Sequence, residues 1–133
     1  MQVQTLSGNE VEALLGLKCN KNALRDLKYL QYADFDKETF IVLTDNDKIL
    51  GVSGIQKSFY DKDLLWLLYI SVDEKHRNKG VASLIVHNIF TYAHDRHLGI
   101  SISRYSDDGE LYLKKVIDKE KNNYPFMQVI IKD

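Results

Sequence analysis

Proline and cysteine are nearly absent from this chain of 133 residues, which holds one of each, Pro125 and Cys19. A single cysteine excludes an internal disulfide framework and a four-cysteine zinc site, and a lone thiol is typical of a reducing cytoplasm. No linker rich in proline or serine, no internal repeat and no low-complexity tract divides the sequence. We therefore expect one continuous domain over residues 1–133.

An excess of either charge is also missing, because 18 basic and 19 acidic residues give a formal net charge of −1. A broad nucleic-acid-binding surface normally shows a basic excess, so nucleic acid is not an expected partner. The longest apolar run, residues 64–70, falls short of the roughly 20 residues that span a bilayer. The first four residues lack the basic and apolar regions of a secretory signal. We expect a soluble, cytoplasmic protein with no membrane partner.

Hydrophobic spacing and turn residues predict a mixture of helices and strands. Ser7 and Glu10 have the spacing of a capping box, which predicts a short first helix, and a second helix is expected to carry Leu24, Leu27 and Leu30. The other expected elements are a hairpin of strands 39–44 and 49–57, a strand over 64–72, a helix over 80–96, a strand over 100–103, a short helix over 107–116 and a last strand over 126–131. This order implies an α/β or α+β sheet with helices on its faces.

One segment combines a buried strand, a polar turn and the start of a helix. It ends the strand with Ile70-Ser71-Val72 and opens the helix with Arg77-Asn78-Lys79-Gly80-Val81-Ala82-Ser83. Glycine has no Cβ to block close approach, and the first amides of a helix have no internal acceptors and lie at its positive dipole end. The pattern therefore indicates an anion cradle suited to phosphate. A plain tight turn is the competing interpretation.

This segment resembles the signature of the GNAT superfamily of N-acetyltransferases, in which Arg/Gln-x-x-Gly-x-Gly/Ala opens a helix after a strand ending in Ile/Leu-x-Val. The hairpin turn before Gly51 and the run Leu111-Tyr112-Leu113-Lys114 are similar to further family segments. The resemblance implies a mixed, mostly antiparallel sheet flanked by helices, with a splayed pair formed by the fourth and fifth family strands. Proteins of this family often form homodimers, so the resemblance leaves the oligomeric state open, with the apolar segment 126–131 as a candidate dimer edge.

The resemblance implies acetyl-CoA as co-substrate and direct transfer of its acetyl group to an amine. The pantetheine arm would run beside Ile70, Ser71 and Val72, and the pyrophosphate would contact the turn and the helix start. The cofactor-binding residues implied in this way are Ile70, Ser71, Val72, Arg77, Asn78, Lys79, Gly80, Val81, Ala82 and Ser83. Tyr112 would be the general acid that protonates the departing sulfur, and packing is its alternative role.

The general base is not assigned by the sequence. Family members often carry a carboxylate in the central strand, whereas here Asp63 lies at the strand edge and Tyr69 is the internal polar residue. A GNAT-fold protein that binds CoA or a partner without catalysis is therefore the alternative function. An unrelated nucleotide-binding domain is a third. No metal site is expected, since His94 and His97 have no third ligand at suitable spacing.

Overall fold

A computed structural model describes residues 2–18, 34–46, 48–58, 60–77, 79–102 and 107–131, with the side chains of all these residues except 15–18, 74 and 107–112. In chain order, the elements are β1 (Gln2–Ser7), α1 (Gly8–Lys18), β2 (Thr39–Asp45), β3 (Lys48–Lys57), β4 (Leu64–Val72), the 3-10 helix η2 (Glu74–His76), α3 (Val81–Asp95), β5 (Gly99–Ile102), α4 (Asp107–Lys121) and β6 (Val129–Ile131).

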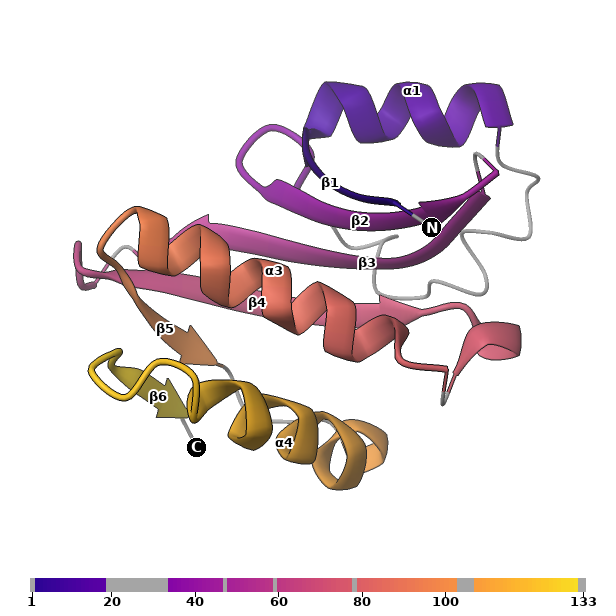
Figure 1. Cartoon of the computed structure of the whole chain (residues 1–133). Helices are drawn as coiled ribbons and strands as arrows, with labels where there is room; N and C mark the ends of the chain where they lie inside the picture. Colours follow the sequence, from indigo (N-terminus) through magenta and orange to yellow (C-terminus); the bar gives the residue numbers. More distant parts are fainter. Residues whose placement is uncertain are drawn as a thin grey trace.

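The strands form a six-stranded sheet whose spatial order follows the chain, from β1 to β6 (Figure 1). The pairs β1–β2, β2–β3 and β3–β4 are antiparallel, whereas β5 pairs in parallel with both β4 and β6. Parallel neighbours need a crossover connection, and α3 and α4 provide the two crossovers. The mixed, mostly antiparallel sheet predicted from the sequence is confirmed.

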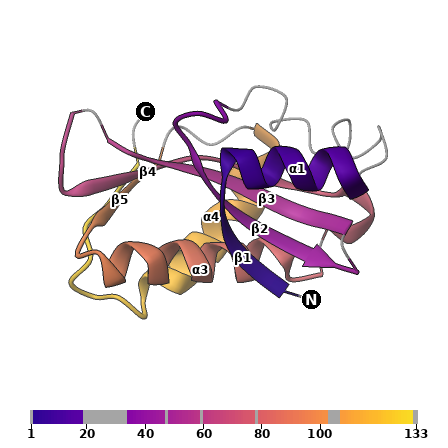
Figure 2. The ribbon, with the colours of Figure 1, turned by 90° about the horizontal axis from the view of Figure 1, so that it is seen from above.

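Helices cover both faces of the sheet. Helix α3 lies on one face and α1 on the other (Figure 2), and α4 packs beside α3 on the first. Neighbouring strand residues point to opposite faces, so β2 supplies Ile41 and Leu43 to the core beneath α3, and Phe40 and Val42 to the core beneath α1. Each helix thus contributes an apolar stripe to its own core.

The predicted elements between residues 39 and 102 are confirmed, as is the capping box. Ser7 N–H donates to Glu10 Oε1 over 3.0 Å, and Glu10 N–H donates to Ser7 Oγ over 3.3 Å. The expected second helix, with Leu24, Leu27 and Leu30, lies outside the described residues.

The structure differs from the predicted elements at three places near the chain ends. Strand β1 was not expected, because its half-polar sequence lacks a clear alternation. Helix α4 continues past Val116, since the next residue, Ile117, is fully buried in the core beneath α3. The last strand begins at Val129, because Met127 N–H closes a turn on Tyr124 O and leaves Phe126 fully exposed.

Candidate functional site

Strand β4 carries a β-bulge at the point where it separates from β5. Leu67 pairs with Ile55 of β3 and Tyr69 pairs with Gly54, so Leu68 is the extra residue. On the other side, the β4–β5 ladder ends at the pair Leu67–Ile102. From Leu68 onward, no described residue pairs with this edge of β4. The splayed pair is therefore confirmed, and the bulge marks its start.

The open edge of β4 presents backbone groups in a regular order. Asp73 N–H donates to Leu50 O of β3 over 2.8 Å, and Tyr69 O accepts from Ser53 Oγ of β3 over 2.7 Å. Alternate residues of an antiparallel strand direct their N–H and C=O groups to opposite sides. Ile70 and Val72 therefore direct theirs into the open gap, while Ser71 bonds toward β3. An extended ligand in the gap can pair with Ile70 and Val72.

The turn after β4 ends at an open helix N-terminus. Gly80 has a φ of 82°, and the first backbone bond of α3 runs from Leu84 N–H to Gly80 O over 3.1 Å. The N–H groups of the three residues between them precede that bond and have no acceptor within the helix. A Cβ built on Gly80 meets no atom within 4 Å, so a ligand can approach the backbone there.

The residues expected around this helix start differ in exposure. Val81 and Ala82 are buried, so their side chains fix the helix to the sheet while their N–H groups face its open end. Ser83, Arg77 and Lys79 are exposed. The two cations lie beside the positive end of the α3 dipole, where an anion is stabilised by both. Asn78 lies outside the described residues.

The buried carboxylate of Asp73 links the turn to the end of β4. Its side chain is 4% exposed, and its Oδ2 lies 2.5 Å from His76 Nδ1 and 3.9 Å from Lys48 Nζ. His76 N–H also donates to Asp73 O over 2.8 Å. A buried carboxylate with these partners ties η2 to the end of β4. The sequence predicted only a polar turn before Arg77 and did not indicate this structural role of Asp73.

A second buried carboxylate lies on the face of the sheet that α1 covers. Glu38, just before β2, is 8% exposed, and its Oε2 accepts from Asp34 N–H. Its Oε1 lies over Gly54 of β3, and so does the ring of Tyr69 from β4. Burial and the negative charge of Glu38 raise the pKa of the Tyr69 phenol. Sequence reasoning noted Tyr69 and missed Glu38, because only the fold brings them together.

Comparison with known proteins agrees with this geometry. Residues 11–108 match the model of the acetyltransferase (GNAT) family. The chain belongs to the GNAT acetyltransferase family. The turn before α3 and the parted strands of this GNAT protein are thus those of an acetyltransferase fold. No curated protein sequence is significantly similar to it.

Solved structures share the fold at low sequence identity. Tetrahymena Gcn5 aligns over 100% of this chain and 89% of its own, with a TM-score of 0.66 and 14% identity. Aminoglycoside N-acetyltransferase AAC(6′)-Iy in complex with CoA aligns over 90% and 89%, with a TM-score of 0.59 and 16% identity. An aminoglycoside acetyltransferase from an uncultured soil metagenomic sample, in complex with sisomicin, aligns over 96% and 89%, with a TM-score of 0.59 and 14% identity.

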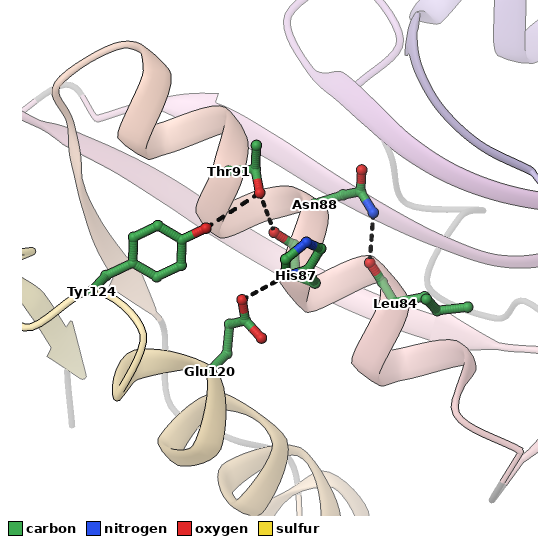
Figure 3. Close-up of polar contacts among 6 residues, drawn as sticks. All are labelled: Leu84, His87, Asn88, Thr91, Glu120 and Tyr124. Atoms are coloured by element: carbon green, nitrogen blue, oxygen red, sulfur yellow. Dashed lines mark hydrogen bonds and ion pairs between the residues drawn. The ribbon is translucent and has the colours of Figure 1, made fainter.

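Helix α4 of this GNAT protein contains Tyr112, whose side chain lies outside the described set. The second half of the helix is held against α3 by polar contacts (Figure 3). His87 Nδ1 lies 2.7 Å from Glu120 Oε1, and Thr91 Oγ1 lies 3.3 Å from the hydroxyl of Tyr124, just after α4. These contacts fix the far end of the helix on which Tyr112 lies.

The described part of the chain also bears on membranes and metals. None of its helices has the length and apolarity needed to cross a bilayer. Within the same residues, no three histidine, cysteine, aspartate or glutamate side chains gather where they could hold a metal ion.

Proposed function

We propose that this GNAT protein transfers the acetyl group of acetyl-CoA directly to an amine, on a small molecule or on a protein or peptide. The observation that carries the proposal is the parting of β4 from β5 at Leu68, close to the open N-terminus of α3. An extended anionic co-substrate needs both features, because its arm can bond to a strand edge and its pyrophosphate to helix amides.

We propose a contact with the cofactor for each predicted cofactor-binding residue. Ile70 and Val72 bond to the pantetheine arm through their backbone groups, with Ser71 between them. The Val72 N–H points into the gap and donates to the thioester carbonyl, where negative charge develops during transfer. The pyrophosphate contacts the backbone N–H groups at the helix start and the polar side chains beside them. The residues that take part are Arg77, Asn78, Lys79, Gly80, Val81, Ala82 and Ser83.

The transfer requires two proton movements. A bond forms between the amine nitrogen and the acetyl carbon, and the bond between that carbon and the CoA sulfur breaks. The amine loses one proton, and the departing sulfur gains one. We assign the second role to Tyr112, because a phenol O–H can donate to sulfur and the chain resembles the family in the segment around it.

The names of related structures support this class of reaction. AAC(6′)-Iy was solved with CoA, and the soil metagenomic aminoglycoside acetyltransferase was solved with the amine sisomicin. For this chain we therefore propose acetyl-CoA as co-substrate and an amine as acceptor, without choosing among amines.

Calorimetric titration with acetyl-CoA tests the cofactor site. We expect micromolar binding of acetyl-CoA and CoA, and binding of pantetheine weaker by at least about tenfold, because pantetheine lacks the pyrophosphate that helix amides recognise. ATP serves as the control for a general nucleotide site. Equal binding of acetyl-CoA and pantetheine would contradict the assignment of the cradle, and preference for ATP would favour an unrelated nucleotide-binding domain.

Release of free thiol from acetyl-CoA tests the reaction. The acceptor panel contains a polyamine, the aminoglycoside sisomicin and a peptide with a free α-amino group. Turnover with any of them supports acetyl transfer to an amine. Binding of acetyl-CoA without turnover would favour the alternative, a CoA-binding regulatory protein, for which the lack of a carboxylate in residues 64–72 is the specific observation.

Two further parts of the proposal concern the cell and the assembly. We propose a cytoplasmic location, in keeping with the single cysteine, and a homodimer formed through the edge strand β6. Ile131 at this edge is 41% exposed, and Phe126 just before it is 100% exposed. Light scattering of the wild type and of Phe126→Ser tests the dimer, which the substitution is expected to weaken.

A further inference from the structure

The turn that leads into α3 begins at a buried carboxylate that is bonded to β3. Asp73 directly follows β4, and its side chain is 4% exposed. Its backbone N–H donates to Leu50 O over 2.8 Å, and its Oδ2 lies 3.9 Å from Nζ of Lys48 at the start of β3. These contacts lie on the side of β4 away from the open gap. Asp73 therefore belongs to the support of the turn and has no direct contact with a ligand in the gap.

His76 is the residue through which Asp73 reaches the turn. The imidazole Nδ1 of His76 lies 2.5 Å from Asp73 Oδ2, and the backbone N–H of His76 donates to Asp73 O over 2.8 Å. The two contacts hold the 3-10 helix η2 from its side chain and from its backbone. Because a buried carboxylate without a partner is costly, this pair fixes His76 relative to the end of β4.

The other end of the turn is fixed by the first residues of α3. Val81 and Ala82 are both buried, which holds the helix start against the sheet. Only residues 77–80 separate this point from His76 along the chain, and they include the exposed cation Arg77. A segment this short between two fixed ends has few conformations open to it. The turn is therefore held from both sides in the free protein.

We propose that Asp73 is a positioning residue for the cofactor, which acts through His76 by holding the turn ready for the pyrophosphate. This inference rests on the proposed function. The physical reason is preorganisation, because a turn that is already ordered loses little conformational entropy when it binds a ligand. When the contact between Asp73 and His76 is broken, residues 77–80 gain conformations that binding must remove. The affinity for acetyl-CoA then falls.

Charge and positioning give Asp73 opposite effects on the pyrophosphate. A carboxylate at the base of the turn repels a bound anion, so electrostatics alone predicts tighter binding of acetyl-CoA when the charge is removed. Positioning predicts weaker binding for the same change. Asp73→Asn removes the charge and keeps the shape of the side chain. The direction in which this substitution moves the Kd therefore separates the two effects.

Three variants and two matched controls test the positioning role. Asp73→Asn and His76→Ala each break the contact, whereas His76→Asn keeps a side-chain N–H that can donate to the carboxylate. Asp63→Asn is the control for charge, because Asp63 is an exposed carboxylate directly before β4. Ser7→Ala is the control for stability, because it breaks the capping box of α1 and leaves the turn untouched.

Calorimetric titration with acetyl-CoA and with pantetheine is the first measurement. It is run at about pH 8.5, well above the usual pKa of histidine, so that a change of charge on His76 does not contribute. We expect the Kd for acetyl-CoA to rise at least about tenfold in Asp73→Asn and His76→Ala. The affinity for pantetheine, which lacks the pyrophosphate, should stay within about twofold of the wild type. His76→Asn should recover most of the affinity, and both controls should match the wild type.

Limited proteolysis by trypsin is the second measurement, and it needs no ligand. Trypsin cleaves after lysine and arginine, and the turn exposes Lys75, Arg77 and Lys79. Cleavage by a protease follows the population of open conformations. We therefore expect cleavage in the turn, relative to cleavage elsewhere in the free chain, to rise at least about fivefold in the two variants that break the contact. It should stay at the wild-type level in both controls. Peptide masses identify the cleaved bonds.

The opposite results are distinct from one another. Unchanged or tighter binding of acetyl-CoA by Asp73→Asn would overturn the positioning role and leave the proposed function standing. Equal losses for acetyl-CoA and pantetheine would overturn it too, because the change would then lie outside the turn, and so would wild-type cleavage of the turn by trypsin.

Two further outcomes are covered by the same design. If Asp73→Asn fails to fold, His76→Ala and His76→Asn decide by the same criteria, at a side chain that is 28% exposed. No binding of acetyl-CoA by the wild type would reject the proposed function, and the role of Asp73 toward the cofactor with it. That outcome is recognised in the wild type alone, before any variant is compared.

Discussion

Gly51 of β3 lies directly beneath Val81, the first residue of α3. A Cβ built on Gly51 would be 2.7 Å from Val81 Cγ1 and 2.8 Å from Ile85 Cδ1. Gly51 also pairs with Val72 at the end of β4. The missing side chain therefore seats the helix N-terminus close to the strand edge, so that one ligand can reach both.

Gly51→Ala should disturb stability and cofactor binding together. The added methyl must displace Val81, whose branched side chain has little freedom, and overpacking of this kind costs about 1–3 kcal/mol. We expect the free energy of unfolding in urea to fall by about 2 kcal/mol, and the Kd for acetyl-CoA to rise. A variant with wild-type stability would show that the helix can shift without cost.

Gly80 offers a pair of variants of equal shape and different charge. Its φ of 82° is a conformation that asparagine and aspartate tolerate better than most residues, and an added Cβ meets no neighbour. Gly80→Asn should bind acetyl-CoA within about threefold of the wild type, whereas Gly80→Asp should bind at least about tenfold more weakly, because a negative charge at the helix start repels the pyrophosphate. Added salt should reduce the difference in acetyl-CoA affinity between the two variants, because salt screens the repulsion. Calorimetry measures both, and equal affinities would remove the cradle assignment.

The turn at Gly80 was predictable because its conformation is set locally. Gly80 must adopt a positive φ, and the apolar period that begins at Val81 fixes the helix start in the sequence itself. The strand that carries Ile70 and Val72 was predictable for the same reason, as a continuous apolar run. The sequence resemblance also implied that β4 would part from β5, and the bulge at Leu68 is where this happens.

The buried pair of Glu38 and Tyr69 on the other face was not predictable, because it depends on residues far apart in the chain. Glu38 reaches Tyr69 only when β2, β3 and β4 are in register and Gly54 leaves room between them. In the sequence, nothing distinguishes Glu38 from the exposed acidic residues, and Gly54 is a candidate for either a bulge or a close approach. The partners of Asp73 come partly from another strand, since Lys48 begins β3.

Asp73 should contribute to the stability of the turn mainly through His76. Asp73→Asn keeps the shape and loses the charge at the 2.5 Å contact, and hydrogen bonds to charged groups contribute about 1.5–3 kcal/mol. We expect a fall of about 2 kcal/mol in the free energy of unfolding. His76→Ala in the Asp73→Asn background should then cost little. Lys48→Met is the control and should cost under about 1 kcal/mol, because that side chain is half exposed.

Tyr112→Phe should lower the rate of acetyl transfer without weakening cofactor binding. If Tyr112 protonates the departing sulfur, kcat should fall about 100-fold, within the range for general acid catalysis, while the Kd for acetyl-CoA stays unchanged. Tyr124→Phe is the matched control, because it removes only the 3.3 Å contact with Thr91 that Figure 3 shows. Equal rates in the two variants would mean that Tyr112 has only a packing role.

The contact between Tyr69 and Glu38 should also be visible in alkaline unfolding. Because burial and Glu38 raise the pKa of the Tyr69 phenol above the usual value of about 10 for tyrosine, the folded chain keeps a proton that the unfolded chain releases. The stabilisation is therefore complete below pH 10 and is lost as pH rises above it. Above that pH, the free energy of unfolding should fall more steeply in the wild type than in Tyr69→Phe, by about one proton. Urea unfolding at a series of alkaline pH values measures both slopes. Urea unfolding of a third variant, Glu38→Gln, should give an intermediate slope, because burial still acts on the phenol when the charge is gone.

Parallel wild-type and Tyr69→Phe curves would contradict this prediction. They would mean that the phenol titrates as it does in the unfolded chain, and that the two side chains do not share a buried site.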